Sequence, residues 1–433
     1  MARLRVLASV YACGPKWGSE IGMGWNWISH LARYCEVTVL TERGFQDDIA
    51  AAASVFCGAA EPRFYYIDVE DKGRRQFWKQ GDWRFYWHYR KWQQRAFVVA
   101  GELTKKMGFD VAHQLNMIGY REPGYLWKLP LPFVWGPIGG HAQMPWRFMR
   151  ILGLRAALKY TARNLLNAVQ MRTHARVRVA TTRAAALIAA TEADQKAIWS
   201  VHRRRAVLIN ETGTRPLEAR TGRSTYNADR PFRLAWCGFF VGRKGMPLAL
   251  RAIASVPAER PVELHIIGYG PEEARWRALA RDLGIDARCR WLGRLDHKDA
   301  LDAMAECDCL LFTSLQEGTS HAVLEALGMG LPVICHDCCG HGDSIDEGCG
   351  IKIPVVSPAS SIKGFTAAIA MLAGSPSLMT QMSRAAVGRA EALSWDNKAR
   401  QMVEIYRRIL HSGCSRTWPD DSTSSMRKHE KSE

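Results

Sequence analysis

Two glutamates eight positions apart, Glu317 and Glu325, are the first residues whose types and spacing suggest chemistry. Glu317 follows an apolar run, 310–313, typical of a buried strand, and a Gly-Thr-Ser turn then leads into a helical pattern, 321–329. The free amides at the start of such a helix suit a diphosphate, and Glu325 could accept hydrogen bonds from a diol. A capping loop followed by a surface glutamate is the alternative interpretation.

A second pattern follows the apolar run 232–237, where Gly238 opens a loop that ends in Arg243, Lys244 and Gly245. Two adjacent cations on a glycine-bearing loop suit a diphosphate leaving group. They would stabilise the negative charge that grows as the bond to that group breaks. A solvated loop on a basic protein is the alternative.

Two further patterns lie in the first half of the chain. A glycine-rich turn, 14–24, follows the first apolar run, and we expect Gly18 and Ser19 to make backbone contacts with a phosphate or sugar. Glu20 is interpreted as a helix-start residue. His113 ends a short apolar run and is a candidate to contact a transferred sugar or an acceptor, with a structural histidine as the alternative.

The string from Glu317 to Val333 resembles the E-x7-E signature of the retaining nucleotide-sugar glycosyltransferases of family four, which have the two-domain GT-B fold. Its Glu-Ala-Leu-Gly-Met-Gly-Leu-Pro-Val end is similar to that family's "EAxAxGxPV". The resemblance implies that Glu325 binds the donor ribose and that Glu317 contacts the transferred sugar. It also implies that amides near the helix start hold the diphosphate.

The other patterns resemble the family only in part. Lys244 matches the family's lysine, whereas Phe239 stands where the family has an arginine, and Arg243 could supply that charge instead. Ser19 replaces one glycine of the family's "GGxE" loop. The predicted catalytic residues are His113, Arg243, Lys244 and Glu317, and the predicted donor-binding residues are Gly18, Ser19, Gly238, Ser320, His321, Ala322, Val323 and Glu325.

The elements that must position these residues alternate between apolar runs and amphipathic stretches, which predicts an α/β fold with parallel sheets. A chain of 433 residues is too long for one core. We expect a Rossmann-like acceptor-side domain at 1–218, a linker at 219–230 and a donor domain at 231–394. A helix at 395–410 crosses back to the first domain, and a disordered tail occupies 411–433.

Cysteine spacing and the length of the apolar runs indicate the compartment in which the protein lies. Twelve irregularly spaced cysteines favour reduced thiols in a cytosol. No apolar run reaches the ~18 residues of a spanning helix, and the N-terminus is expected to form a strand rather than a signal peptide.

Cys335 and Cys338 form one CxxC, for which zinc is the alternative to buried or loop thiols. The resemblance implies no metal and no cofactor.

The net charge of +17 is unevenly distributed, because no Asp or Glu occurs between Pro123 and Thr191. Such a surface favours anionic partners. Aromatic and basic residues alternate through 72–92, and a second basic, partly apolar stretch covers 146–183. Together they predict a peripheral protein on the anionic inner membrane face. Aromatic residues buried in the first domain, with a solvated basic face, are the alternative.

We therefore predict a retaining glycosyltransferase that uses a nucleotide-sugar donor and a lipid-linked or polysaccharide acceptor in cell-surface glycan synthesis. The resemblance suggests front-face attack, in which the donor phosphate helps to take the acceptor proton while the enzyme positions the reactants. Another GT-B enzyme, such as a nucleotide-sugar epimerase, is one alternative. A basic nucleic-acid-binding protein is another, but it leaves Glu317, Glu325 and Lys244 unexplained, and we predict no nucleic-acid partner.

Overall fold

The computed structural model describes residues 3–16, 18–56, 61–69, 83–215, 226, 230–257 and 259–411. The predicted linker, apart from residues 226 and 230, lies outside the described residues. The predicted tail beyond 411 and the basic segment 72–82 lie outside them as well.

The first domain is built on a sheet of seven parallel strands. These are β1 (Leu4–Val10), β2 (Cys35–Glu42), β3 (Arg63–Ile67), β4 (Val111–Asn116), β5 (Phe133–Ile138), β6 (Ala186–Ala189) and β7 (Val207–Leu208). Their order is β3-β2-β1-β4-β5-β6-β7. Every residue of β4 and β5 is buried, so both faces of the sheet centre are covered, as parallel sheets require.

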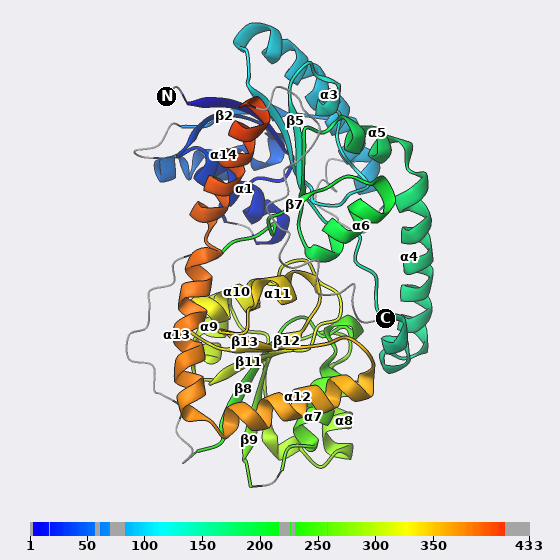
Figure 1. The fold of residues 1–433 in the computed structure, drawn as a ribbon, viewed down its shortest axis with the longest axis vertical. Helices are drawn as coiled ribbons and strands as arrows, with labels where there is room; N and C mark the ends of the chain where they lie inside the picture. Colours follow the sequence, from blue (N-terminus) through cyan, green and yellow to red (C-terminus); the bar gives the residue numbers. More distant parts are fainter. Residues whose placement is uncertain are drawn as a thin grey trace.

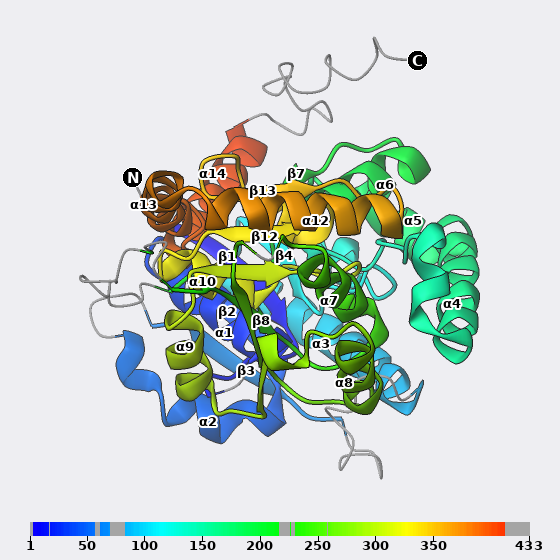
Figure 2. The same ribbon diagram turned by 90° about the horizontal axis from the view of Figure 1, so that it is seen from below.

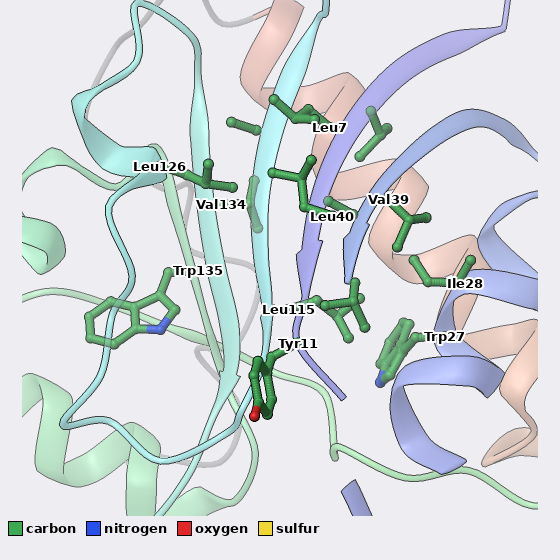
Figure 3. Close-up of a cluster of buried hydrophobic side chains, with 14 of the residues drawn as sticks. Leu7, Tyr11, Trp27, Ile28, Val39, Leu40, Leu115, Leu126, Val134 and Trp135 are labelled. Carbon is green, nitrogen blue, oxygen red and sulfur yellow. The ribbon is translucent and has the colours of Figure 1, made fainter. Parts of the chain in front are cut away.

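Helices and turns of the first domain connect these strands. They are α1 (Ser19–Leu31), η1 (Arg43–Phe45), α2 (Gln46–Ala50), η2 (Ala53–Phe56), α3 (Trp83–Met107), η4 (Leu126–Lys128), η5 (Trp146–Leu152), α4 (Leu154–Thr173), α5 (Ala175–Arg183) and α6 (Glu192–His202). Figure 3 shows part of the core that they enclose, where Leu7, Ile28 and Leu115 gather in one cluster. In α3, Phe85, Tyr89 and Trp92 are fully buried, so these aromatic residues build the core.

The second domain contains six parallel strands in the order β10-β9-β8-β11-β12-β13. The strands are β8 (Phe232–Cys237), β9 (Val262–Ile267), β10 (Cys289–Gly293), β11 (Cys309–Phe312), β12 (Val333–His336) and β13 (Gly350–Ile353). The helices and turns are η6 (Gly242–Lys244), α7 (Met246–Ala254), α8 (Glu273–Asp282), η7 (Asp286–Arg288), α9 (His297–Ala305), α10 (His321–Gly328), α11 (Cys339–Ser344), α12 (Pro358–Ala373) and α13 (Pro376–Ala392).

Side chains along β8 alternate between two apolar clusters. Leu234 and Trp236 face a cluster that includes residues of α7, α8 and α12, whereas Ala235 faces one that includes residues of α9, α10 and α13. This period of two is the geometry of a strand covered on both faces. Together the two sheets confirm the predicted α/β fold with two parallel-sheet, Rossmann-like domains.

The last helix, α14 (Trp395–His411), packs on the first domain although it follows the second in sequence (Figure 1). The ring of Trp395 meets that of Trp27 of α1 edge-on, with centroids 5.8 Å apart. Met402 and Val403 belong to the first domain's core cluster. The chain therefore returns from the second domain to the first at α14.

A bridging segment, defined here as residues 141–173, adds a second connection between the domains. Its Phe148 and Leu152 share an apolar cluster with Leu248 and Leu315 of the second domain. Arg275 of α8 donates a hydrogen bond to the Leu152 carbonyl at 3.1 Å. The loops of the second domain are thus held against an extension of the first.

Among the described residues, no single helix is both long and apolar enough to cross a membrane. The pair α12 and α13 meets this criterion only when taken together, and its two members are bent by 103°.

We expect the packing of α14 to contribute strongly to stability. Trp395 is 3% exposed, so Trp395→Ala should lower the free energy of unfolding by about 3–5 kcal/mol. Trp199 of α6 is 46% exposed, and Trp199→Ala should cost less than about 1 kcal/mol. Urea unfolding followed by circular dichroism measures both variants. Similar midpoint shifts for the two would contradict the assigned role of α14.

Candidate functional site

Two loops of the second domain meet where its strand order reverses. β8 and β11 are neighbours in the sheet, while their connections lead to opposite edges. The loops that follow them, 238–245 and 313–320, therefore lie together at the carboxyl ends of the strands. Such a reversal point is where open parallel sheets bind ligands. Arg243, Lys244 and Glu317 lie on these two loops, and Glu325 lies on the helix that follows the second loop.

The carboxylate of Glu317 joins the two loops. Its Oε1 atom lies 2.7 Å from Nη1 of Arg243 and also contacts Nζ of Lys244. The hydroxyl of Ser314 donates a hydrogen bond to the same oxygen at 3.1 Å. Burial acts to raise the pKa of Glu317, but the charges of Lys244 and Arg243 outweigh it and hold the pKa below the ordinary value. The result is a compact ionised cluster.

Glycines in the first loop allow this arrangement. A Cβ on Gly245, whose φ is +69°, would lie 2.3 Å from the carbonyl oxygen of Thr313. A Cβ on Gly238 would lie 3.3 Å from Cε of Lys244, so the missing side chain leaves room for the lysine. The hydroxyl of Thr313 donates to the Lys244 carbonyl at 2.9 Å, which fixes the loops to each other.

Helix α10 begins directly after the second loop, with Ser320 as its N-cap residue. The first amides of a helix, here those of His321, Ala322 and Val323, have no acceptor within the helix. Glu325 lies on α10, and its Oε1 atom accepts a hydrogen bond from Nε2 of His297 at 2.8 Å. Sequence reasoning missed His297, which is the first residue of α9.

Glu211 joins the first domain to this site and was also missed from the sequence. It is 6% exposed, and its Oε2 atom accepts a hydrogen bond from the Thr319 hydroxyl at 2.7 Å. A Cβ on Gly318 would lie 2.3 Å from Oε1 of Glu211, so only glycine fits beside this carboxylate. Burial raises the pKa of Glu211 above its ordinary value.

The first sheet has its own reversal point between β1 and β4, and the glycine-rich turn lies there. Gly18 is the N-cap residue of α1, and Ser19 starts the helix with a φ of 53°. Glu20 accepts a hydrogen bond from the Ile118 amide at 3.3 Å. Burial raises the pKa of Glu20 to about 7, opposed by the Ile118 amide and assisted by the nearby charge of Glu211.

His113 does not have the place expected for a ligand-binding residue. Its side chain is fully buried, and Nε2 lies 2.7 Å from the Gly136 carbonyl, which can only accept a hydrogen bond. Nδ1 therefore accepts from the hydroxyl of Tyr406 at 2.6 Å. Burial lowers the pKa of His113 to about 4, so the ring is neutral. The prediction of a catalytic role is corrected: His113 anchors α14.

The CxxC cysteines are placed as buried and loop thiols. Cys335 is buried within β12, and Cys338 is the N-cap residue of α11. Within the part of the chain that the structure describes, no group of three or more His, Cys, Asp or Glu side chains could hold a metal ion.

Comparison with known proteins points to one enzyme family for the second domain. Residues 225–388 match the family model described as "Glycosyl transferases group 1". The chain is 29% identical over 187 residues to a D-inositol 3-phosphate glycosyltransferase of Corynebacterium kroppenstedtii, covering 40% of this chain and 41% of that protein. It is 29% identical over 179 residues to the lipopolysaccharide core biosynthesis glycosyltransferase LpsE of Rhizobium meliloti, covering 41% and 50%. The matches thus span half or less of these relatives.

Solved structures resemble nearly the whole chain. The lipopolysaccharide outer core galactosyltransferase WaaB, in its apo form, has a TM-score of 0.62 and 15% identity, covering 95% of this chain and all of that chain. Anabaena HepE in complex with UDP and glucose has a TM-score of 0.57 and 14% identity, covering 94% and 100%. These similarities show that the two domains form a GT-B fold.

We expect stability to depend on pH through Glu20. Because the folded-state pKa is about 7 and the ordinary value is 4.5, the folded protein binds more protons than the unfolded chain between these values. The free energy of unfolding should therefore fall as pH rises through this window. Across this window the free energy of unfolding of the wild type should fall by about 1–2 kcal/mol relative to that of Glu20→Gln. This is less than the full pKa shift would give, because the carboxyl group keeps some contact with water.

Urea unfolding at a series of pH values measures this difference. Glu102→Gln, at an exposed position of α3, serves as the matched control and should run parallel to the wild type. If the difference in free energy of unfolding between the wild type and Glu20→Gln stayed constant across this pH series, it would contradict the expected protonation of Glu20.

Proposed function

We propose that this protein is a retaining glycosyltransferase that transfers a sugar from a nucleoside-diphosphate sugar to a glycan acceptor. The observation that carries the proposal is the cluster of Glu317, Arg243 and Lys244 at the strand reversal point of the second domain. This cluster lies next to the start of α10 and within the segment that matches the glycosyltransferase family model.

The diphosphate would bind between Lys244, Arg243 and the first amides of α10. Both cations already hold an anionic oxygen, that of Glu317, so the site is preorganised for negative charge. A diphosphate that takes over part of these contacts would free Glu317 to accept hydrogen bonds from sugar hydroxyls. The cations and helix amides would then stabilise the charge of the departing diphosphate.

Glu325 is proposed to accept hydrogen bonds from the donor ribose. Its side chain is 26% exposed, and His297 is a polar partner that can orient the carboxylate or give way to the diol. Phe239 and Tyr269 are both exposed and meet edge-on, with ring centroids 5.3 Å apart, on the loops after β8 and β9. Their aromatic surface would suit the flat base or the apolar face of a sugar.

In the proposed reaction, the acceptor oxygen forms a bond to the anomeric carbon on the face from which the diphosphate leaves. The bond from that carbon to the diphosphate oxygen breaks, and the acceptor proton passes to the departing phosphate. Glu317 is held by two cations, so its assigned role is to bind the sugar rather than to attack it. The residues Gly18 and Ser19 would contact the donor or acceptor through their backbone. No metal or other cofactor is part of this proposal.

We propose a lipid-linked or polysaccharide acceptor at the anionic inner face of the membrane. LpsE is named as a lipopolysaccharide core biosynthesis glycosyltransferase, and WaaB as a lipopolysaccharide outer core galactosyltransferase. Both names support a cell-surface glycan as the acceptor. HepE was solved with UDP and glucose, which supports a nucleotide-sugar donor. The described cysteines are free thiols, which favours a reducing, cytoplasmic setting.

Donor binding is the first property to test. A nucleotide sugar at about 100 times its dissociation constant should add about 2.7 kcal/mol to the free energy of unfolding. A panel of nucleotide sugars and nucleoside diphosphates, without added metal, is screened for a rise in melting temperature. Lys244→Met and Glu325→Gln should lose most of the response, whereas Glu306→Gln, at an exposed position after α9, should keep it.

Two outcomes would count against the proposal. The donor site is refuted if no nucleotide stabilises the wild type, or if Lys244→Met responds as strongly as the wild type does. A stabilising nucleotide sugar that is converted to another nucleotide sugar with no acceptor present would identify an epimerase instead.

A further inference from the structure

Helix α4 exposes a row of large apolar side chains. The exposed fractions along it are 78% for Leu154, 63% for Leu158, 58% for Leu165 and 57% for Val169. At 100° per residue, these four positions fall within an arc of about 60° on the helix. We call them the outer stripe. Figure 1 and Figure 2 both place α4 at the outer edge of the molecule, away from the two sheets.

The opposite face of α4 is buried and polar. The side chain of Asn164 accepts a hydrogen bond from the Met144 amide at 3.1 Å and donates to its carbonyl at 2.8 Å. Asn167 accepts from the hydroxyl of Tyr120 at 2.7 Å. Rotation of α4 to bury the outer stripe would break these bonds and leave buried polar groups unsatisfied, so the sequence commits the leucines to the outside.

Cations border the outer stripe. Arg155 and Lys159, which are both exposed, follow one side of it in the helical projection, at about 100° and 140° from Leu154. The whole stretch 124–191 contains no acidic residue. If a second copy of the chain bound here through the same surface, the basic faces of the two copies would meet and their like charges would repel each other. The charge pattern therefore selects an anionic partner with an apolar interior.

We propose that the outer stripe of α4 docks on an anionic lipid surface. The leucines would enter the boundary between headgroups and acyl chains, and the bordering cations would lie at the headgroups. This proposal assigns a membrane-binding element to the enzyme of the proposed function. It rests on that function only for the reason to bind a membrane, which is access to a lipid-linked acceptor. In α3, by contrast, Phe85, Tyr89 and Trp92 are buried in the core, and the exposed aromatic residues are the adjacent pair Tyr86 and Trp87.

The place of α4 in the fold would give such docking a consequence at the site. Tyr160, on the buried side of α4, belongs to the same apolar cluster as Leu248 and Leu315. Leu315 is two residues from Glu317, and its amide donates to the Arg243 carbonyl at 2.9 Å. A membrane bound to α4 would therefore hold the Glu317 cluster at a fixed distance from the lipid surface.

The test is co-sedimentation of the full chain with vesicles. Vesicles of phosphatidylcholine alone are compared with vesicles that also contain phosphatidylglycerol, at low and at high salt. The wild type should bind the anionic vesicles, and binding should weaken in high salt because the headgroup attraction is screened. The double variant L158Q/L165Q should lose roughly tenfold or more in affinity, because two apolar side chains no longer enter the interface.

A matched control removes a comparable apolar side chain elsewhere. Val356 lies in the second domain and is 54% exposed, so V356Q should bind anionic vesicles as the wild type does. Circular dichroism and thermal stabilisation by a nucleotide sugar are measured for every variant. L158Q/L165Q should keep both, which separates a failure of docking from a failure of the donor site.

Three results would overturn the proposal. The first is equal binding of anionic vesicles by L158Q/L165Q and the wild type. The second is no binding of anionic vesicles by the wild type. The third is a wild-type dimer in solution that L158Q/L165Q converts to a monomer without any change in vesicle binding, because the stripe would then be an interface between copies of this chain.

Discussion

The carboxylate of Glu317, held between Arg243 and Lys244, is the interaction on which the arrangement of the two loops at the carboxyl edge of the second sheet depends. Two cations this close repel each other, and Lys244 is almost buried, so an anion must lie between them when no ligand does. That requirement fixes both loops. The first loop needs Gly238 and Gly245 to bring Lys244 inward. The second loop must place Glu317 within reach of both cations. The strand reversal between β8 and β11 supplies the space for the two loops to meet.

The same cluster depends on the first domain. Thr319, two residues after Glu317, is held by the buried carboxylate of Glu211. On another side, the bridging segment packs against Leu315 and Leu248. Any rotation of one domain against the other must therefore act on the loop that carries Glu317. We expect domain movement and donor binding to be coupled through this loop, since both change the partners available to the same short segment.

The sequence was sufficient to predict the fold class, the loops that carry Glu317 and Lys244, and the helix that carries Glu325, because apolar runs and glycine-bearing turns are local signals. It was insufficient where partners come from distant elements. Glu211 and His297 lack a motif, and each acquires its place only when separate strands and helices assemble. His113 ends an apolar run as a ligand-binding histidine would, and only the packing of α14, which supplies Tyr406, shows that its ring is fully used. The strand β13 has the sequence Gly-Ile-Lys-Ile, which lacks the continuous apolar run that marks β11, a strand of the same length.

The two reversal points carry opposite electrostatic character, and this contrast suits the proposed chemistry. Cations and helix amides dominate the second domain's edge, whereas Glu20 and Glu211 lie at the edge of the first. Two ionised carboxylates there would repel an incoming diphosphate. Burial instead raises the pKa of both groups, to about 7 for Glu20, so that Glu20 is partly protonated near neutral pH. A carboxyl group in that state can donate or accept a hydrogen bond. In the proposed reaction it could therefore meet sugar hydroxyls without opposing the negative charge of the diphosphate at the second domain.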